Sequence, residues 1–227
     1  MAVISRQRSF IFLHAPKTAG TSIADALAPW SDVEVPDERM HLTLDECLDY
    51  LSEAEIRAFR KIMVARNTWD RVASAYWHHL RAPMLEPEVH RDISRSGLAG
   101  FIRRYARPVW MAQTRWLDFR KQRMPVEILR FEKLESDFDA FCRSMGVTAR
   151  LRSLNRTDGR PPVDVTYTMR TRRLVASVFA DEIEEFGFQP PPTVSAKERD
   201  ARAELFRRGL IPVSNRTLRT TTGRKLR

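Results

Sequence analysis

The chain has 227 residues, a length that suits one domain with a substantial hydrophobic core. Its 43% of hydrophobic residues is ordinary for a globular protein and excludes a wholly disordered chain. The formal net charge of +10 predicts that part of the surface meets an anion, such as a nucleotide, a polyanionic glycan, nucleic acid or a membrane headgroup, and charge alone does not choose among these.

The apolar runs of the chain are short. Near the start, the run Phe10 to Leu13 is far below the length of a signal-peptide core or a membrane span, and no later run approaches that length. We therefore expect a cytoplasmic protein with no membrane span. The two cysteines, Cys47 and Cys142, lie in stretches with helical spacing of apolar residues, which favours small buried thiols over a disulfide.

Strand and helix patterns alternate in the first part of the chain. The stretch Ser9 to Leu13 is rich in β-favouring side chains and predicts a buried strand, followed by a loop from Pro16 to Gly20 and a helix from Thr21 to Leu27. A pair of helices is expected next. One runs from the cap residue Thr43 through Leu51, and the other begins at Ser52 with a capping box.

A second strand and helix follow. Lys61 to Arg66 predicts a buried strand, and Asn67 can cap the helix after it. That helix has an apolar stripe at helical spacing, formed by Trp69, Val72, Ala73, Tyr76, Trp77 and Leu80. The stretch Arg81 to Arg95 lacks periodicity and predicts a surface excursion, whereas Gly97 to Tyr105 predicts a helix.

The last part of the predicted domain repeats this alternation. Val126 to Arg130 predicts a third strand, and Leu134 to Met145 predicts a helix that ends at Gly146. A loop is expected from Arg152 to Val165. One long helix is then expected from Tyr167, with Gly187 as its stop.

The run Pro190 to Pro192 marks a boundary. We assign residues 1–190 to one domain, and residues 191–227 to a charged helix and a basic tail that begins at Ser214. Strands that alternate with helices predict an α/β protein with a three-layer, P-loop-like fold, in which a central, mainly parallel sheet is flanked by helices. Ligands of such sheets bind at the carboxyl ends of the strands.

The loop after the first strand has the composition of an anion cradle. It places small residues, hydroxyls and Lys17 where backbone N–H groups gather at a helix N-terminus. The Walker A loop has its lysine after the second glycine, but here Lys17 precedes Gly20, so the Walker pattern fails. A turn with a solvated lysine is the alternative interpretation of this segment.

The loop after the second strand offers a phosphate clamp. The strand ends in Arg66, and on the next helix Arg71, Ser74 and His78 are spaced to share a side that we expect to face outward. A guanidinium at a strand end and a serine hydroxyl two turns into the helix can hold one phosphate monoester. An ordinary charged helix face is the alternative interpretation.

With these two loops, the sequence resembles the sulfotransferases that use 3′-phosphoadenosine 5′-phosphosulfate (PAPS). Within that family it is similar to the branch that contains heparan 2-O-sulfotransferase, the chondroitin and dermatan sulfotransferases and bacterial relatives. Phe10 to Ser22 resembles the family's 5′-phosphosulfate loop, and Val64 to Tyr76 its 3′-phosphate motif. Weaker likenesses extend the match over residues 9–188. Thr68 stands where the motif usually has proline, and threonine can share the capping task.

The resemblance implies roles for named residues. Lys17 would contact the bridging and sulfuryl oxygens of the donor, while Arg66 and Ser74 would hold its 3′-phosphate. The loop that would surround the 5′-phosphosulfate comprises Pro16, Lys17, Thr18, Ala19, Gly20, Thr21 and Ser22. No metal ion is expected, because the sulfuryl group carries one negative charge and the protein's cations suffice for the leaving group.

The acceptor hydroxyl must lose a proton, so a base should lie near the donor loop. We choose His41, since in this branch the histidine of the corresponding segment is the usual base, and Glu38 is the rival. His14 adjoins the loop with a supporting role, and His78 and His79 line the site or its rim. The residues that could cover the adenosine or the 3′-phosphate are Asn155, Arg156 and Arg160.

Two other functions compete with this interpretation. A small-molecule kinase would share the sheet and the anion loop, but its lysine would stand elsewhere and an aspartate for magnesium would end the second strand. A polyanion- or nucleic-acid-binding protein would suit the charge, but much of the excess lies in the terminal tail. We expect a nucleotide donor and a hydroxyl acceptor as partners, with an anionic glycan as the candidate acceptor and no nucleic acid; the oligomeric state stays open.

Overall fold

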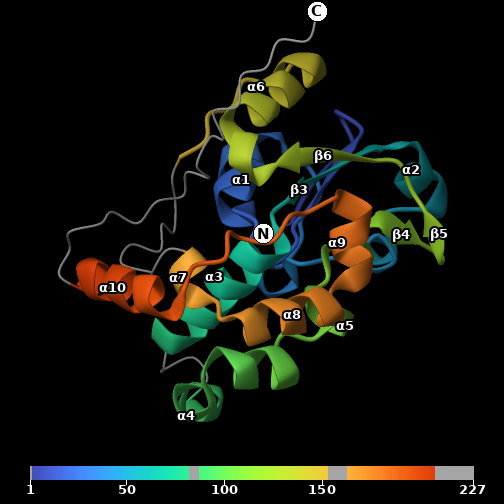
Figure 1. Ribbon diagram of the computed structural model, residues 1–227. Coiled ribbons are helices and arrows are strands. Elements are labelled where there is room, and N and C mark those ends of the chain that lie inside the picture. The colour runs from blue at the N-terminus through green and yellow to red at the C-terminus, as the bar shows by residue number, and fades with distance from the viewer. Residues whose placement is uncertain (1, 82–86, 153–162, 208–227) are drawn as a thin grey trace, which may run out of the picture.

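The computed structural model describes residues 2–81, 87–152 and 163–207, and a four-stranded sheet lies at its centre (Figure 1). The strands lie in the order β1-β2-β3-β6. The strands β2 (Phe10–Leu13), β3 (Arg60–Ala65) and β6 (Val126–Arg130) are parallel, and β1 (Val3–Ser5) pairs antiparallel with β2. The protein is therefore α/β with a mixed, mostly parallel sheet, and the three predicted strands are confirmed.

Two short antiparallel pairings were not predicted. A tight turn joins β1 to β2, with Ser9 at φ 52° and its N–H 3.2 Å from the carbonyl of Arg6. The strands β4 (Asp118–Phe119) and β5 (Gln122–Arg123) form a hairpin whose two turn residues, Arg120 and Lys121, both have positive φ. Such a turn usually contains asparagine or glycine, so the sequence carried no hairpin signal here.

Helices cover one face of the sheet. α1 (Gly20–Leu27) and α6 (Leu134–Met145) pack their apolar sides against it. The buried residues of this layer are Val3, Phe10, Phe12, Ile23, Ala24, Leu27, Ile62, Val64, Leu129, Phe138, Phe141, Cys142 and Val147. Gly146 ends α6 in the left-handed region at φ 62°, so the predicted stop is confirmed.

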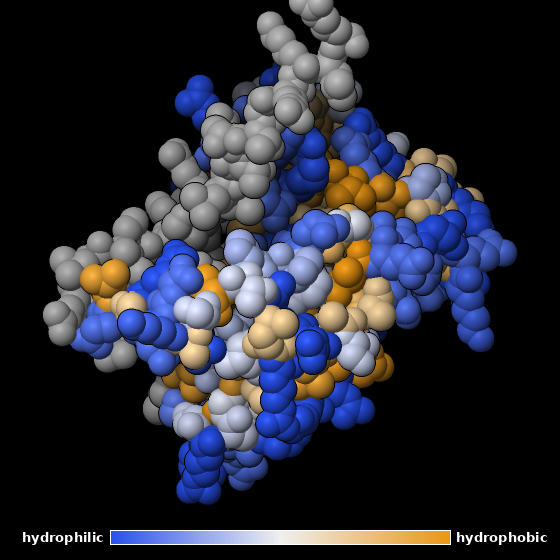
Figure 2. All heavy atoms as spheres, viewed as in Figure 1, coloured by the Kyte–Doolittle hydropathy of each residue, from blue (hydrophilic) through white to orange (hydrophobic). Residues whose placement is uncertain are grey.

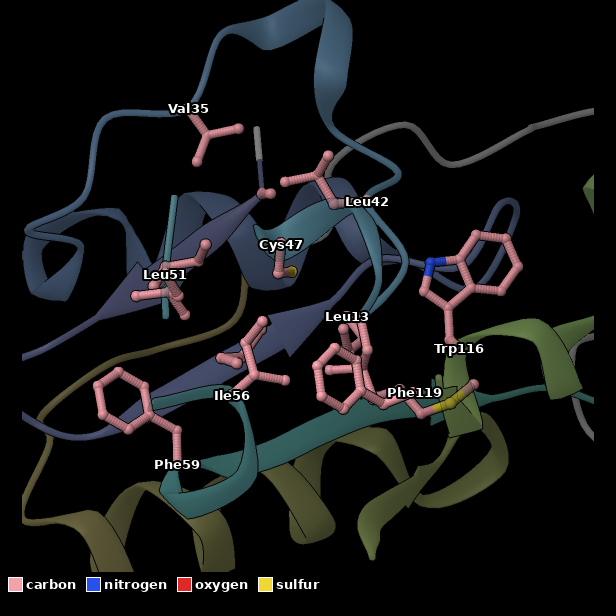
Figure 3. Close-up of a cluster of buried hydrophobic side chains, with 14 of the residues drawn as sticks. Leu13, Val35, Leu42, Cys47, Leu51, Ile56, Phe59, Trp116 and Phe119 are labelled. Carbon is pink, nitrogen blue, oxygen red and sulfur yellow. The ribbon is translucent and has the colours of Figure 1, made fainter. Parts of the chain in front are cut away.

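Mostly non-helical chain covers the opposite face. Figure 3 shows Val35, Leu42, Cys47 and Leu51 packed with Ile56 and Phe59 over Leu13, beside Trp116 and Phe119. The short 3₁₀ turns η1 (Ala28–Trp30), η2 (Asp37–Arg39) and η3 (Glu46–Asp49) occur along residues 28–49, and α2 (Glu53–Ala58) follows. The predicted capping box of α2 is confirmed, since Ser52 and Glu55 bond reciprocally.

The prediction of a helix from Thr43 through Leu51 is wrong, because the regular element that forms within these residues is the short turn η3. The start signal itself is present, because the Glu46 carboxylate accepts hydrogen bonds of 2.7 Å from both the N–H and the hydroxyl of Thr43. The N–H groups of Tyr50 and Leu51 both bond to the carbonyl of Cys47, which closes a single turn. Burial of Leu44, Cys47 and Leu51 against the sheet then outweighs continuation of the helix.

A helical group begins directly after β3. It consists of α3 (Thr68–Arg81), α4 (Pro87–Arg104), α5 (Pro108–Met111), α7 (Val163–Thr166), α8 (Met169–Val178) and α9 (Ala180–Phe186), and the 3₁₀ turn η4 (Gln113–Leu117) connects α5 to β4. The predicted stripe of α3 lies in the core of this group. The cap is confirmed as well, since the N–H of Trp69 bonds to Asn67 Oδ1 at 3.1 Å.

Two predictions in this group are wrong. The excursion expected from Arg81 to Arg95 is helical from residue 87, and Gly97, at φ 63°, kinks α4 and obscures its periodicity. The single helix expected from Tyr167 is two helices, because Phe179 has a non-helical backbone at φ −118°, ψ 32° and is buried there. The predicted helix stop at Gly187 is confirmed, since this residue follows α9 in the left-handed region at φ 62°.

The remaining parts are the 3₁₀ turn η5 (Phe131–Lys133), which links β6 to α6, and α10 (Ala196–Arg207), which packs beside α7. α10 is the charged helix expected after the prolines, and the tail from Ser214 lies outside the described residues. Cys47 and Cys142 are free and buried, as predicted. Hydrophilic residues cover most of the face seen in Figure 2, and no helix in the described ranges is long and apolar enough to cross a bilayer.

Candidate functional site

The carboxyl ends of β2, β3 and β6 bring the candidate residues together. β2 leads to Lys17, β3 leads to Arg66, and β6 leads to Phe131. The Arg66 guanidinium donates a hydrogen bond of 2.9 Å from Nη1 to the carbonyl of Lys17 and lies 4.1 Å from the centre of the Phe131 ring. The two loops singled out from the sequence are therefore in direct contact, as neighbouring parallel strands require.

The backbone of the first loop is shaped to receive an anion. Lys17 and Ala19 both have positive φ, 65° and 64°, which non-glycine residues adopt at a cost of about 1 to 2 kcal/mol each. This alternation turns consecutive N–H groups to one side, the arrangement called a nest. α1 begins immediately afterwards without a carboxylate in its first turn, so its N-terminal dipole stays available for an anion.

Hydroxyl groups of this loop differ in their roles. Thr18 is fully buried, and its hydroxyl donates to the carbonyl of Ala15 at 2.8 Å. The Thr18 hydroxyl proton therefore forms a hydrogen bond within the loop, and this bond stabilises the turn. Thr21 is exposed in the first turn of α1, whereas Ser22 is buried. Thr21 is thus the hydroxyl of this turn that solvent, or a ligand, can reach.

Gly20 is required by the ring of His14. A Cβ atom built on Gly20 would lie 1.8 Å from His14 Cδ2 and 2.0 Å from Nε2. The imidazole is 4% exposed and packs between Phe12, at 5.9 Å, and His41, at 4.5 Å between ring centres. Burial lowers the pKa of His14 to about 3, so the ring is neutral, and it packs against the backbone of the loop at Gly20.

His41 is held by the carbonyl of that same residue. His41 Nδ1 lies 2.8 Å from the His14 carbonyl oxygen. Because a carbonyl only accepts, the neutral ring carries its proton on Nδ1 and its lone pair on Nε2. Desolvation lowers the pKa of His41, the bond to His14 opposes this, and the charge of Lys17 lowers it further. The geometry therefore presents an unprotonated Nε2 within the electrostatic reach of Lys17.

The second loop differs from the sequence prediction in one respect. Arg71 and Ser74 do not face outward: Arg71 is fully buried and Ser74 is 4% exposed, while His78 is exposed. Arg71 is buried because Glu182 of α9 pairs with it at 2.8 Å and the carbonyl of Met111 accepts a bond of 2.6 Å from its Nη1. Arg71 is thus a core residue, and the interpretation of this side as a charged, solvated helix face is also wrong.

Two residues behind the site, Gln113 and Glu182, belong to the weaker likenesses and received no role from the sequence. Gln113 is fully buried, and its side chain bonds both backbone groups of Arg66. Glu182 is 1% exposed and accepts from Arg71, Thr68 and Gln113. A signal existed for Glu182, since it falls at helical spacing on the apolar side of Val175, Phe179 and Phe186, where a carboxylate needs a buried partner.

Other candidate residues lie apart or outside. Glu38, the rival base, is exposed in η2. His79 packs against Phe101 in the helical group, 5.7 Å between ring centres. Asn155, Arg156 and Arg160 lie outside the described residues. Across the part of the chain that the structure describes, no three histidine, cysteine, aspartate or glutamate side chains gather as metal ligands would.

Comparison of the chain with protein-family models, with curated proteins and with solved structures finds no match.

Proposed function

We propose that this protein is a PAPS-dependent sulfotransferase with a P-loop-like fold, which transfers a sulfuryl group to a hydroxyl, with a carbohydrate as the acceptor class. One observation carries the proposal: the lysine-bearing nest and the strand-end arginine are joined by the 2.9 Å bond between Arg66 Nη1 and the Lys17 carbonyl. Two anion-binding elements thus lie side by side. A donor with a phosphosulfate at one end and a separate 3′-phosphate needs two such elements.

The residues divide the donor between them. The N–H groups of the nest and of the first turn of α1 bind the 5′-phosphosulfate, with Lys17 on the bridging and sulfuryl oxygens and Thr21 contributing its hydroxyl. Arg66 binds the 3′-phosphate; the resemblance gives Ser74 the same role, but the Ser74 side chain is 4% exposed. Phe131 lies against the Arg66 guanidinium, which limits its rotation and keeps it aimed at this ligand.

The transfer is an in-line displacement. The acceptor oxygen forms a bond to sulfur while the bond from sulfur to the bridging oxygen breaks, and both electrons of that bond leave with the 5′-phosphate of adenosine 3′,5′-bisphosphate. Lys17 stabilises the charge that develops on this leaving oxygen. The acceptor proton passes to His41 Nε2, the nitrogen that the His14 carbonyl leaves with its lone pair.

The donor assignment is tested by calorimetry with adenosine 3′,5′-bisphosphate, AMP and ATP, with and without magnesium. We expect metal-independent binding that depends on the 3′-phosphate and weakens at least tenfold (about 1.4 kcal/mol) in Arg66→Ala. Arg104→Ala, which removes an exposed arginine of α4, is the matched control and retains wild-type affinity. A magnesium-dependent preference for ATP would instead support the kinase alternative and refute the proposal.

The base assignment is tested separately. His41→Ala should keep nucleotide affinity and lose about a hundredfold or more in transfer rate, whereas Glu38→Gln should change neither. The wild-type rate should rise with pH and reach half of its maximum below pH 6.5, since burial lowers the pKa of His41 from its ordinary value of 6.5. If His41→Ala keeps full activity while Glu38→Gln loses it, the glutamate is the base.

A further inference from the structure

A continuous chain of buried polar groups connects α9 with the donor loop. It begins at the Glu182 carboxylate, whose two oxygens each lie 2.8 Å from Arg71 Nη2. The same carboxylate accepts from the Thr68 hydroxyl at 2.6 Å and from the Gln113 N–H at 2.5 Å. These three donors, on α3 and at the start of η4, fix the position of a carboxylate that is 1% exposed.

Gln113 carries the connection from Glu182 to Arg66. Its Nε2 donates to Glu182 Oε1 at 2.9 Å and to the Arg66 carbonyl at 3.0 Å, while its Oε1 accepts from the Arg66 N–H at 2.8 Å. Both amide protons and the amide oxygen are therefore used. A flipped amide would oppose oxygen to the Glu182 carboxylate and to the Arg66 carbonyl, so Glu182 dictates the orientation in which Gln113 can bind Arg66.

Gln113 contacts the chain at the residue that follows the end of β3. β3 ends at Ala65, which pairs with Arg130 of β6, and Arg66 lies beyond this ladder. Gln113 supplies to Arg66 one donor and one acceptor, the same pair of bonds that a neighbouring strand would supply. Arg66 in turn donates from Nη1 to the carbonyl of Lys17, the left-handed residue of the nest.

We infer that Gln113 is a positioning residue for the donor's 3′-phosphate: it fixes the Arg66 backbone so that the guanidinium meets that phosphate, and Glu182 fixes Gln113. This inference rests on the proposed function. It accounts for a fully buried glutamine at 0% exposure whose polar atoms all face one arginine and one carboxylate. A side chain needed only to fill space would be apolar at this position.

The test measures the ratio of the affinities for adenosine 3′,5′-bisphosphate and AMP by calorimetry. In Gln113→Leu we expect affinity for the bisphosphate to fall about tenfold and affinity for AMP to stay within about twofold, so that the ratio falls. Gln113→Asn, which keeps the amide but withdraws it by one methylene, should show the same direction and is the variant to use if Gln113→Leu does not fold. Adding Gln113→Leu to Arg66→Ala should cause no further loss, because both act on one contact.

Two controls separate positioning from general destabilisation. Gln122→Leu makes the same chemical change on the exposed strand β5, and Ile93→Ala destabilises the buried core of α4; both should keep the wild-type ratio. If the wild-type protein prefers the bisphosphate and the Gln113 variants keep that preference, the inference is overturned and the proposed function stands. If the wild-type protein shows no preference for the 3′-phosphate, the proposed function itself fails.

Discussion

Substitution of Glu182 by glutamine gives the sharpest test of how this fold is held together. Glu182 and Arg71 form an ion pair whose side chains are 1% and 0% exposed. Glu182→Gln keeps the shape of the side chain but removes its charge, so the Arg71 guanidinium is left buried without a counter-charge. The replacement amide also turns an N–H₂ group toward donors that previously met a carboxylate oxygen.

The expected loss is large. Removing one partner of a buried ion pair typically costs about 3 to 5 kcal/mol, against a total stability of about 5 to 15 kcal/mol for a domain. At about 2 to 4 °C per kcal/mol for a chain of this size, the melting temperature should fall by about 6 to 20 °C. An exposed pair offers the matched comparison: Glu53→Gln breaks the Arg57–Glu53 bridge, whose side chains are 41% and 47% exposed, and should cost under about 1 kcal/mol.

Urea unfolding followed by tryptophan fluorescence measures both variants, with an unchanged slope m as the check on two-state behaviour. A third variant isolates the cause. Arg71→Met combined with Glu182→Gln removes the isolated charge and should be more stable than Glu182→Gln alone. The reasoning is refuted if Glu182→Gln costs no more than Glu53→Gln, or if the double variant is the less stable of the two.

Three further predictions concern Gly20 of the donor loop, the His14 ring that packs against it, and the cap of α2. Gly20→Ala should destabilise the protein by about 1 to 3 kcal/mol, since its Cβ would lie 1.8 Å from the His14 ring; a neutral result in urea unfolding would contradict the packing. Burial lowers the pKa of His14 from 6.5 to about 3, so its contribution to stability is complete above pH 6.5 and falls by about 1.4 kcal/mol per unit as the pH drops from about 6 to about 4. His14→Leu should remove that part of the slope, and equal slopes would refute the assignment. Ser52→Ala should cost about 1 kcal/mol by removing the cap of α2, with nucleotide affinity unchanged.

Local patterns determined much of the candidate site. The order strand, lysine-bearing loop and helix follows from the run Phe10 to Leu13 and the residues after it, and the contact between this loop and Arg66 follows because neighbouring parallel strands end at one edge. His41 was selected by its place in a resemblance. The structure adds the 2.8 Å bond to the His14 carbonyl, a contact across 27 positions that no local pattern contains.

The wrong predictions for α3 and for the helix after Thr43 share one cause, which is packing between segments far apart in the chain. The side of α3 that holds Arg71 and Ser74 has the composition of a solvated face. Arg71 is buried there because it bonds to Met111 and Glu182, which lie 40 and 111 positions later. The helix expected after Thr43 was shortened because burial of its apolar residues on the sheet outweighed its local propensity.

The sequence by itself determined the parallel strands, most of the helix ends and the lysine-bearing turn before α1, because these depend on periodicity, capping residues and turn residues close together in the chain. Only the tertiary structure decided that Arg71 is buried, that Gln113 completes the strand end at Arg66, and that the His14 carbonyl binds Nδ1 of His41. These features depend on hydrogen bonds and burial between distant segments, whose energies are fixed only when the layers meet.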